Sequence, residues 1–128
     1  MLRIKELTKA EEQIMHILWE IKSGSVNDII KHYREPRPKY TTISTIIRIL
    51  ETKGFIGHKK VSKAFHYHPL VDKQIYTRIL MRGILAKYFG NSLRQMVSFL
   101  SHEKSLSVTE LEELKNIIEE EIRMQRQL

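Results

Sequence analysis

The residues with the clearest chemical character lie on one face of a helix that the sequence predicts between Pro38 and Gly54. This face carries short hydroxyl groups and long cations, with no carboxylate before Glu51: Lys39, Tyr40, Thr41, Thr42, Ser44, Thr45 and Arg48. A helix face that is merely solvated usually mixes Glu with Lys. A helix that lies against phosphates and base edges instead presents donors and keeps acids away. The pattern therefore indicates a recognition helix for nucleic acid.

Positive charge is concentrated around this helix. The chain of 128 residues has a formal net charge of +7. Residues 31–63 contain nine Lys or Arg residues and two acids, so this window accounts for the whole net charge and the rest of the chain is neutral in sum. A polyanionic partner is therefore expected at this window.

A basic hairpin is predicted directly after the helix. From Phe55 to Leu70 the apolar residues alternate with period two, which is typical of strands, and residues 62–64 form the turn between them. Lys59, Lys60 and Lys63 lie at the tip and its flanks without an acid, and His66 is expected near phosphates too. The structural alternative is a solvated basic turn.

Two N-terminal helices must position these elements. Each begins with a capping box, Thr8 with Glu11 and Ser25 with Asp28, and the first helix is predicted to end at Gly24. Three helices followed by a basic hairpin is the order of a winged helix-turn-helix domain. We therefore predict an α+β fold, mainly helical, with a winged helix-turn-helix domain of three helices and a small β-hairpin wing at residues 1–70.

Residues 71–128 are predicted to form a helical dimerisation domain. Its short helices carry apolar stripes that have no further partner within the chain, and self-association is the economical way to bury them. The residues expected at this homodimer surface are Ile84, Tyr88, Phe89, Leu93, Met96, Val97, Leu100, Leu111, Leu114, Ile117, Ile118 and Ile122.

Several kinds of chemistry find no support in the sequence. There is no cysteine, so disulfides and thiolate sites are excluded, and His66 and His68 share a strand face without an identifiable third ligand. We therefore expect no metal and no cofactor. The sequence has no phosphate-binding glycine loop and no nucleophile elbow, so we predict that it is not an enzyme. It also lacks a signal peptide and a membrane-spanning stretch of about 18 apolar residues, which predicts a cytoplasmic protein without membrane insertion.

The motifs, in this order, resemble the penicillinase and methicillin-resistance repressor family (BlaI/MecI type), a group of bacterial winged-helix transcriptional repressors connected with antibiotic resistance. The resemblance covers nearly the whole chain and rests on residues 7–12, 17–19, 40–45, 50–51, 53–56, 67–71, 89–93, 106–107 and 110–114. It implies a sequence-specific DNA-binding repressor, a homodimer that places its third helix in the major groove of a palindromic double-stranded operator. The implied contacts to bases and phosphates are Thr41, Thr42, Ser44 and Thr45 on the helix and Lys59, Lys60 and Lys63 on the wing.

The resemblance further implies relief of repression by a membrane sensor-protease, with cleavage near Ser98, Phe99 and Leu100. The Asn-Phe pair of the best-known members is absent there. Two other functions remain open at this point: a winged-helix module that binds an acidic protein, and a basic binder of nucleic acid without sequence preference.

Overall fold

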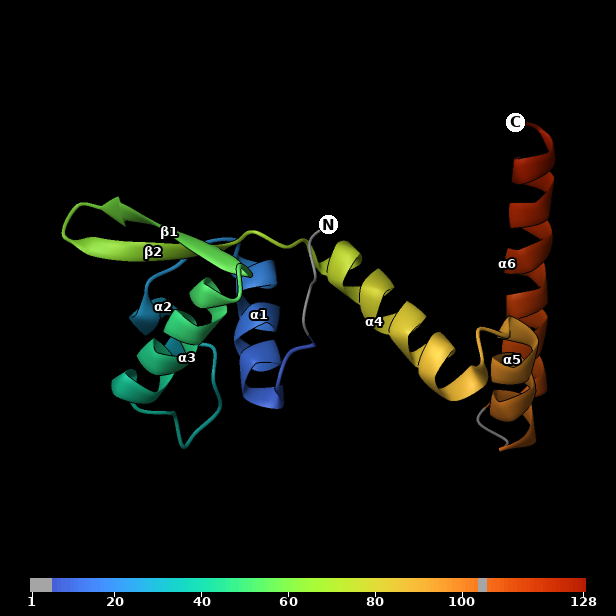
Figure 1. The fold of residues 1–128 in the computed structure, drawn as a ribbon, viewed down its shortest axis with the longest axis horizontal. Coiled ribbons are helices and arrows are strands. Elements are labelled where there is room, and N and C mark those ends of the chain that lie inside the picture. Colours follow the sequence, from blue (N-terminus) through green and yellow to red (C-terminus); the bar gives the residue numbers. More distant parts are fainter. Residues whose placement is uncertain (1–5, 104–105) are drawn as a thin grey trace. The chain divides into compact units, whose positions relative to one another are not determined.

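The computed structural model describes residues 6–103 and 106–128. Its elements are α1 (Lys9–Ile21), α2 (Val26–Ile30), α3 (Tyr40–Thr52), β1 (Ile56–Val61), β2 (Ala64–Pro69), α4 (Lys73–Phe89), α5 (Leu93–His102) and α6 (Val108–Arg126) (Figure 1). The contacts divide the chain into two compact units, one ending at Met81 and the other comprising Arg82–Leu128. The prediction of a mainly helical chain with one small hairpin is confirmed.

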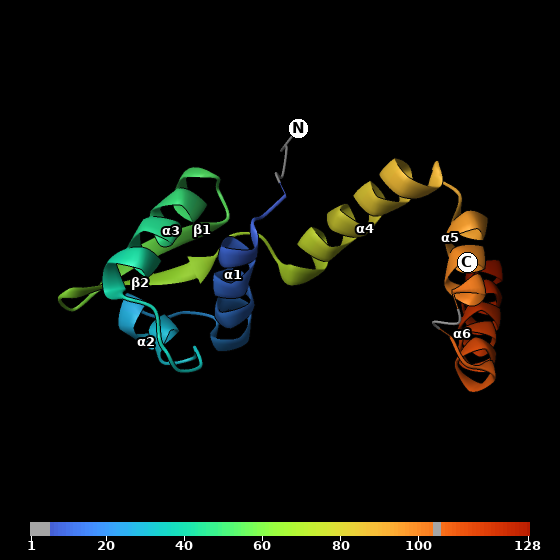
Figure 2. The same ribbon diagram turned by 90° about the horizontal axis from the view of Figure 1, so that it is seen from below.

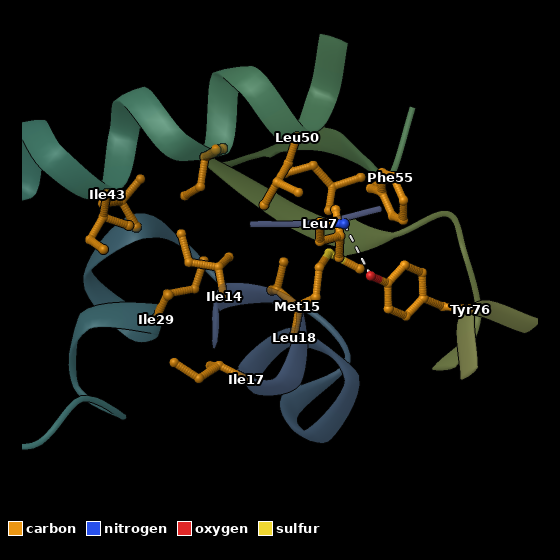
Figure 3. Packing of buried hydrophobic residues seen from close by; sticks show 13 residues of the cluster. Leu7, Ile14, Met15, Ile17, Leu18, Ile29, Ile43, Leu50, Phe55 and Tyr76 are labelled. Carbon is orange, nitrogen blue, oxygen red and sulfur yellow. Dashed lines mark hydrogen bonds between the residues drawn. The ribbon is translucent and has the colours of Figure 1, made fainter. Parts of the chain in front are cut away.

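Helices α1 to α3 form the core of the first unit. The predicted capping boxes are present at both N-termini: the Thr8 hydroxyl accepts from the Glu11 amide, and the Ser25 hydroxyl accepts from the Asp28 amide. The apolar faces of the three helices meet and exclude water, as Figure 3 shows for part of the cluster. The largest fully buried side chains are those of Phe55, Ile14, Met15, Leu18, Ile29, Ile43, Ile47, Leu50 and Ile56.

Helix α1 ends earlier than the sequence predicts. It stops at Ile21, and Lys22 adopts the positive φ of 72° that follows it. Gly24 serves another purpose: its amide donates to the carbonyl oxygen of Tyr67 at 3.0 Å and its carbonyl accepts from the Tyr67 amide at 2.8 Å. A Cβ atom at Gly24 would lie 2.9 Å from Ile21 Cδ1. Gly24 therefore lies close to the Ile21 side chain and pairs with β2 through its backbone, whereas Gly54, with φ of 84°, follows α3 as predicted.

Strands β1 and β2 form a two-stranded antiparallel sheet that lies along α3 (Figures 1 and 2). The register pairs Lys60 with Phe65 and Lys59 with His66. Residues directly opposite each other share a face of the sheet, so Lys59 and Lys60 point to opposite faces. The connection is Ser62 and Lys63, and Ser62 has a φ of 59°. Ala64, expected in the turn, is the first residue of β2.

The first unit includes the beginning of α4. Tyr76 is 4% exposed, and its hydroxyl accepts a hydrogen bond of 3.0 Å from the Leu7 amide (Figure 3). Its ring meets that of Phe55 edge-on, with centroids 5.8 Å apart. Trp19 donates from its indole Nε1 to the Val71 carbonyl oxygen at 2.9 Å, as suits a residue at the core edge. The contacts that hold this unit together therefore continue beyond residue 70.

The second unit consists of the end of α4 with α5 and α6, and these last two helices lie side by side (Figures 1 and 2). Gly90 and Asn91 both have positive φ and separate α4 from α5, which Ser92 caps. The rings of Phe89 and Phe99 pack with centroids 5.7 Å apart. Helix α6 begins with a third capping box, formed by Ser107 and Glu110.

Within residues 6–103 and 106–128, no helix combines the length and the apolar character needed to cross a membrane.

Candidate nucleic-acid interface

The outward face of α3 is set by the residues that α3 buries. Ile43, Ile47 and Leu50 are at most 2% exposed and fix the rotation of the helix against the core. The predicted contact residues consequently fall on the remaining surface, where all are exposed except Ser44, which is half-buried: Lys39, Tyr40, Thr41, Thr42, Ser44, Thr45 and Arg48. Nearly three turns of helix thus present hydroxyl groups and cations together, without a carboxylate ahead of Glu51.

Threonine hydroxyls on α3 are partly used by the helix itself. Thr45 Oγ1 donates to the Thr41 carbonyl oxygen at 2.9 Å, and Thr52 Oγ1 donates to the Arg48 carbonyl oxygen at 3.0 Å. The hydroxyl hydrogens of these two residues are therefore not available to a base edge. Each can still present a methyl group and the lone pairs of its oxygen.

Sequence reasoning missed Ile49, a large apolar residue on the outward side of α3. It is 44% exposed, and a shallow open hollow on this surface is lined by Thr45, Arg48, Ile49, Thr52 and Lys53. A signal for it was present in the sequence, because Ile49 lies off the apolar stripe of α3, which is spaced i, i+3, i+4, i+7 and consists of Ile43, Ile46, Ile47 and Leu50.

The wing carries its cations on more than one side. Lys59, Lys60 and Lys63 are all exposed, and His66 is half-buried. Lys60 shares its face with His58, which bonds to α3, whereas Lys59 and His66 are paired on the other face. The structure therefore places Lys60 on the face of the hairpin that contacts α3 through His58, and His66 on the opposite face. Lys63 lies in the turn between the strands.

Two side-chain contacts that the sequence did not indicate, one of them an ion pair, anchor the C-terminal end of α3. Lys53 Nζ donates to Glu11 Oε1 at 2.7 Å, which joins α3 to the start of α1. His58 Nδ1 lies 2.5 Å from Glu51 Oε2, which joins the wing to α3. Because the charge of Lys53 is offset by Glu11, we expect Lys53 to contribute little to the attraction of phosphates.

The pKa of Glu11 reflects its setting. Burial alone would raise the pKa of this carboxyl group, which is 4% exposed. The hydrogen bonds from Lys53 and from the amide and hydroxyl of Thr8 outweigh burial, and the pKa lies below its ordinary value. Glu11 is therefore charged, and its carboxylate accepts hydrogen bonds from Thr8 and from Lys53 at the end of α3.

Comparison with known proteins identifies the family of this chain. Residues 7–120 match the model of a family described as penicillinase repressor. The chain belongs to the penicillinase repressor family. It is 34% identical over 116 residues to the methicillin resistance regulatory protein MecI of Staphylococcus aureus (strain N315). This alignment covers 88% of this chain and 93% of that protein. It is 30% identical over 123 residues to the penicillinase repressor of Bacillus licheniformis, with 94% of each chain covered.

Solved structures agree with the family assignment. The solution structure of the DNA-binding domain of the repressor BlaI matches with a TM-score of 0.50 and 30% identity, over 59% of this chain and 94% of that one. The Bacillus licheniformis BlaI monomeric form in complex with the blaP half-operator matches with the same values. The predicted winged-helix fold of the first unit is thereby confirmed.

The match to the penicillinase repressor family also includes α5 and most of α6. In the second unit most of the apolar residues predicted for dimerisation are exposed, whereas four are half-buried. The exposed residues are Tyr88, Leu93, Val97, Leu111, Leu114, Ile117, Ile118 and Ile122, and the half-buried ones are Ile84, Phe89, Met96 and Leu100. Ser98, Phe99 and Leu100, the expected cleavage region, lie inside helix α5. Among the described residues, no three His, Asp or Glu side chains gather in a way that could hold a metal ion.

Proposed function

We propose that this penicillinase repressor family member represses transcription as a homodimer on a palindromic operator. Each subunit inserts α3 into a major groove, and the wing contacts the neighbouring backbone through Lys60 and Lys63. The observation that carries the proposal is the outward face of α3, which collects hydroxyls and Arg48 while its rotation is fixed by the buried stripe. A relative in this family has been solved on a half-operator through the corresponding domain, which supports the same mode of binding here.

The dimer forms through the second unit. Apolar side chains recur along α6, and Ile117 and Ile118 are 64% and 53% exposed. A second copy of the chain covers them with the same surface, which gives the two-fold symmetry that a palindrome requires. The six glutamates of α6 repel phosphates and keep this unit away from the DNA, while the basic window of the first unit is drawn to it.

Relief of repression follows cleavage in α5 by a membrane sensor-protease. Proteases bind their substrates as extended chains, so the helix must open locally before Ser98, Phe99 and Leu100 can be cut. The exposed Phe99 (52%) contacts Phe89, and this contact is among those that opening breaks. In this proposal the protein works in the cytoplasm beside its operator and has no enzymatic activity of its own.

The experiment that tests the repressor proposal is a titration of the full chain against DNA from its own upstream region. We expect two chains to bind together to an inverted repeat and to give a footprint there. The protein should prefer this repeat to shuffled competitor DNA by roughly 10³-fold or more. If the dimer neutralises about 6–10 phosphates, raising the salt from about 50 to 200 mM should weaken binding by about 10³–10⁵-fold.

Two outcomes would replace the proposal. Shuffled DNA that removes the protein equally well indicates a basic binder without sequence preference. Absence of DNA binding, together with salt-dependent capture by an acidic protein, indicates a protein-interaction module.

A further inference from the structure

We propose that Ile49 contacts the 5-methyl group of a thymine in the operator, so that the protein recognises this base by apolar contact. The inference deepens the proposed function and rests on it. Ile49 is 44% exposed on the surface of α3 that faces outward. A lone exposed isoleucine needs no explanation on most surfaces, but this one lies within the face that is proposed to enter the major groove.

The neighbours of Ile49 make its surroundings apolar. Thr45 precedes it by four residues and Thr52 follows by three, and these spacings place side chains side by side on a helix. Both threonine hydroxyls donate to carbonyl oxygens of their own helix, at 2.9 and 3.0 Å. The three residues line one hollow together with Arg48 and Lys53. Two methyl-bearing threonines thus flank the isoleucine on an open surface.

The two cations that line this hollow, Arg48 and Lys53, can interact with partners other than the base. Lys53 bonds to Glu11 at 2.7 Å, which holds its charge on the side of α1. Arg48 is exposed and long enough to reach a phosphate while Ile49 approaches the base edge. The centre of the hollow therefore offers apolar contact, and its rim offers charge.

Thymine is the base that fits such a hollow. In the major groove it presents the O4 acceptor and the C5 methyl group, whereas cytosine presents an amino donor and adenine a donor and an acceptor. The isoleucine side chain has no polar atom that could form a hydrogen bond with the amino groups of cytosine or adenine. Covering an amino group without a hydrogen bond is unfavourable. Burying Ile49 against a methyl group carries no such cost and removes apolar surface from water.

The test is a scan of the footprinted operator in which each thymine of one half-site is replaced in turn by deoxyuridine. This change removes the methyl group and leaves the base-pairing atoms intact. We expect one position at which the full-length protein binds about fourfold more weakly, the effect of losing one buried methyl contact. The measurement is the dissociation constant by fluorescence anisotropy at fixed salt.

The scan is repeated with Ile49→Ala and with Ile75→Ala as a matched control. Ile75 is an isoleucine of similar exposure, 46%, on α4. Ile49→Ala should bind thymine and uridine operators equally at the sensitive position, and Ile75→Ala should keep the full difference. The salt dependence of Ile49→Ala should equal that of the wild type, because no phosphate contact is removed.

Each other outcome is decisive. If the operator is footprinted but no uridine weakens binding, Ile49 remains in water and the inference is wrong, while the repressor proposal stands. If a uridine weakens binding equally in Ile49→Ala, another residue contacts that methyl group and the inference is again wrong. If there is no footprint on thymine-containing DNA, the proposed function fails and the inference fails with it.

Discussion

Replacing Lys53 by Met tests how α3 is anchored to α1. The substitution keeps most of the aliphatic stem but removes the cation that donates to Glu11 at 2.7 Å. Glu11, at 4% exposure, is left as a buried carboxylate that keeps its bonds from Thr8. A hydrogen bond to a charged group contributes about 1.5–3 kcal/mol, and breaking a buried ion pair from one side costs about 3–5 kcal/mol.

The exposure of Lys53 sets the expected magnitude within that range. Its side chain is 25% exposed, so water can partly replace the lost cation, and we expect Lys53→Met to lower the free energy of unfolding by about 2–3 kcal/mol. Glu11→Gln should cost about 1 kcal/mol, because glutamine keeps the capping box and Lys53 can turn to water. The double variant should cost less than the sum of the two, which would show direct coupling.

The assay is urea unfolding of the full chain followed by tryptophan fluorescence. Trp19 is the single tryptophan of the sequence and lies in the first unit, so its signal reports this unit. Lys63→Met, at an exposed turn position, serves as the matched control and should be nearly neutral. Additive effects of Lys53→Met and Glu11→Gln would refute the reasoning, as would a full loss of stability in the control.

The same pair predicts a pH dependence whose sign follows from the lowered pKa of Glu11. A carboxyl group whose pKa is lower in the folded state stabilises the protein above its unfolded pKa, and this contribution is lost as the pH falls through the folded pKa. The stability difference between wild type and Lys53→Met should therefore be constant near neutrality and shrink below the ordinary pKa of 4.5. An undiminished difference in acid would mean that the charge of Glu11 is not its cause.

Three further predictions concern the proposed function. Lys63→Ala should weaken binding to all DNA sequences alike, measured by fluorescence anisotropy. The slope of the logarithm of the binding constant against the logarithm of the salt concentration should become shallower by about one per subunit. A change in operator preference alone would contradict the assignment of Lys63 to the wing contact. Thr42→Ala should relax the preference for the operator over single-base variants, with a loss of about 1–3 kcal/mol of discrimination in competition assays. Ile118→Asp should give a monomer in analytical ultracentrifugation, because a charge enters the apolar stripe of α6; a stable dimer would place the interface elsewhere.

Local features of the fold could be predicted from the sequence. The capping boxes at Thr8 and Ser25 depend on residues three apart, and Gly54 marks the end of α3 for a local conformational reason. The rotation of α3 about its own axis could also be predicted, because the spacing of its apolar residues indicates which side faces the core. The candidate contact surface followed from that rotation alone.

Long-range pairs could not be predicted in this way. Lys53 and Glu11 are 42 residues apart, and no local pattern distinguishes a lysine that bonds to a buried carboxylate from one that faces a phosphate. Gly24 resembled a helix stop because its close approach to Ile21 and its pairing with Tyr67 depend on tertiary contacts. An aromatic residue on α4, such as Tyr76, likewise does not show by its spacing which unit buries it.

The burial of Tyr76 in the first unit determines what cleavage in α5 would leave behind. A fragment that ends near Phe99 retains Tyr76 and its bond to Leu7, so it keeps every residue of the buried core and its α3 surface. What it loses is the tether that holds a second α3 close to the second half-site, at an effective concentration in the millimolar range for short linkers. Release of the promoter would then be a loss of avidity between two intact domains, and the same fragment at high concentration would occupy the operator again.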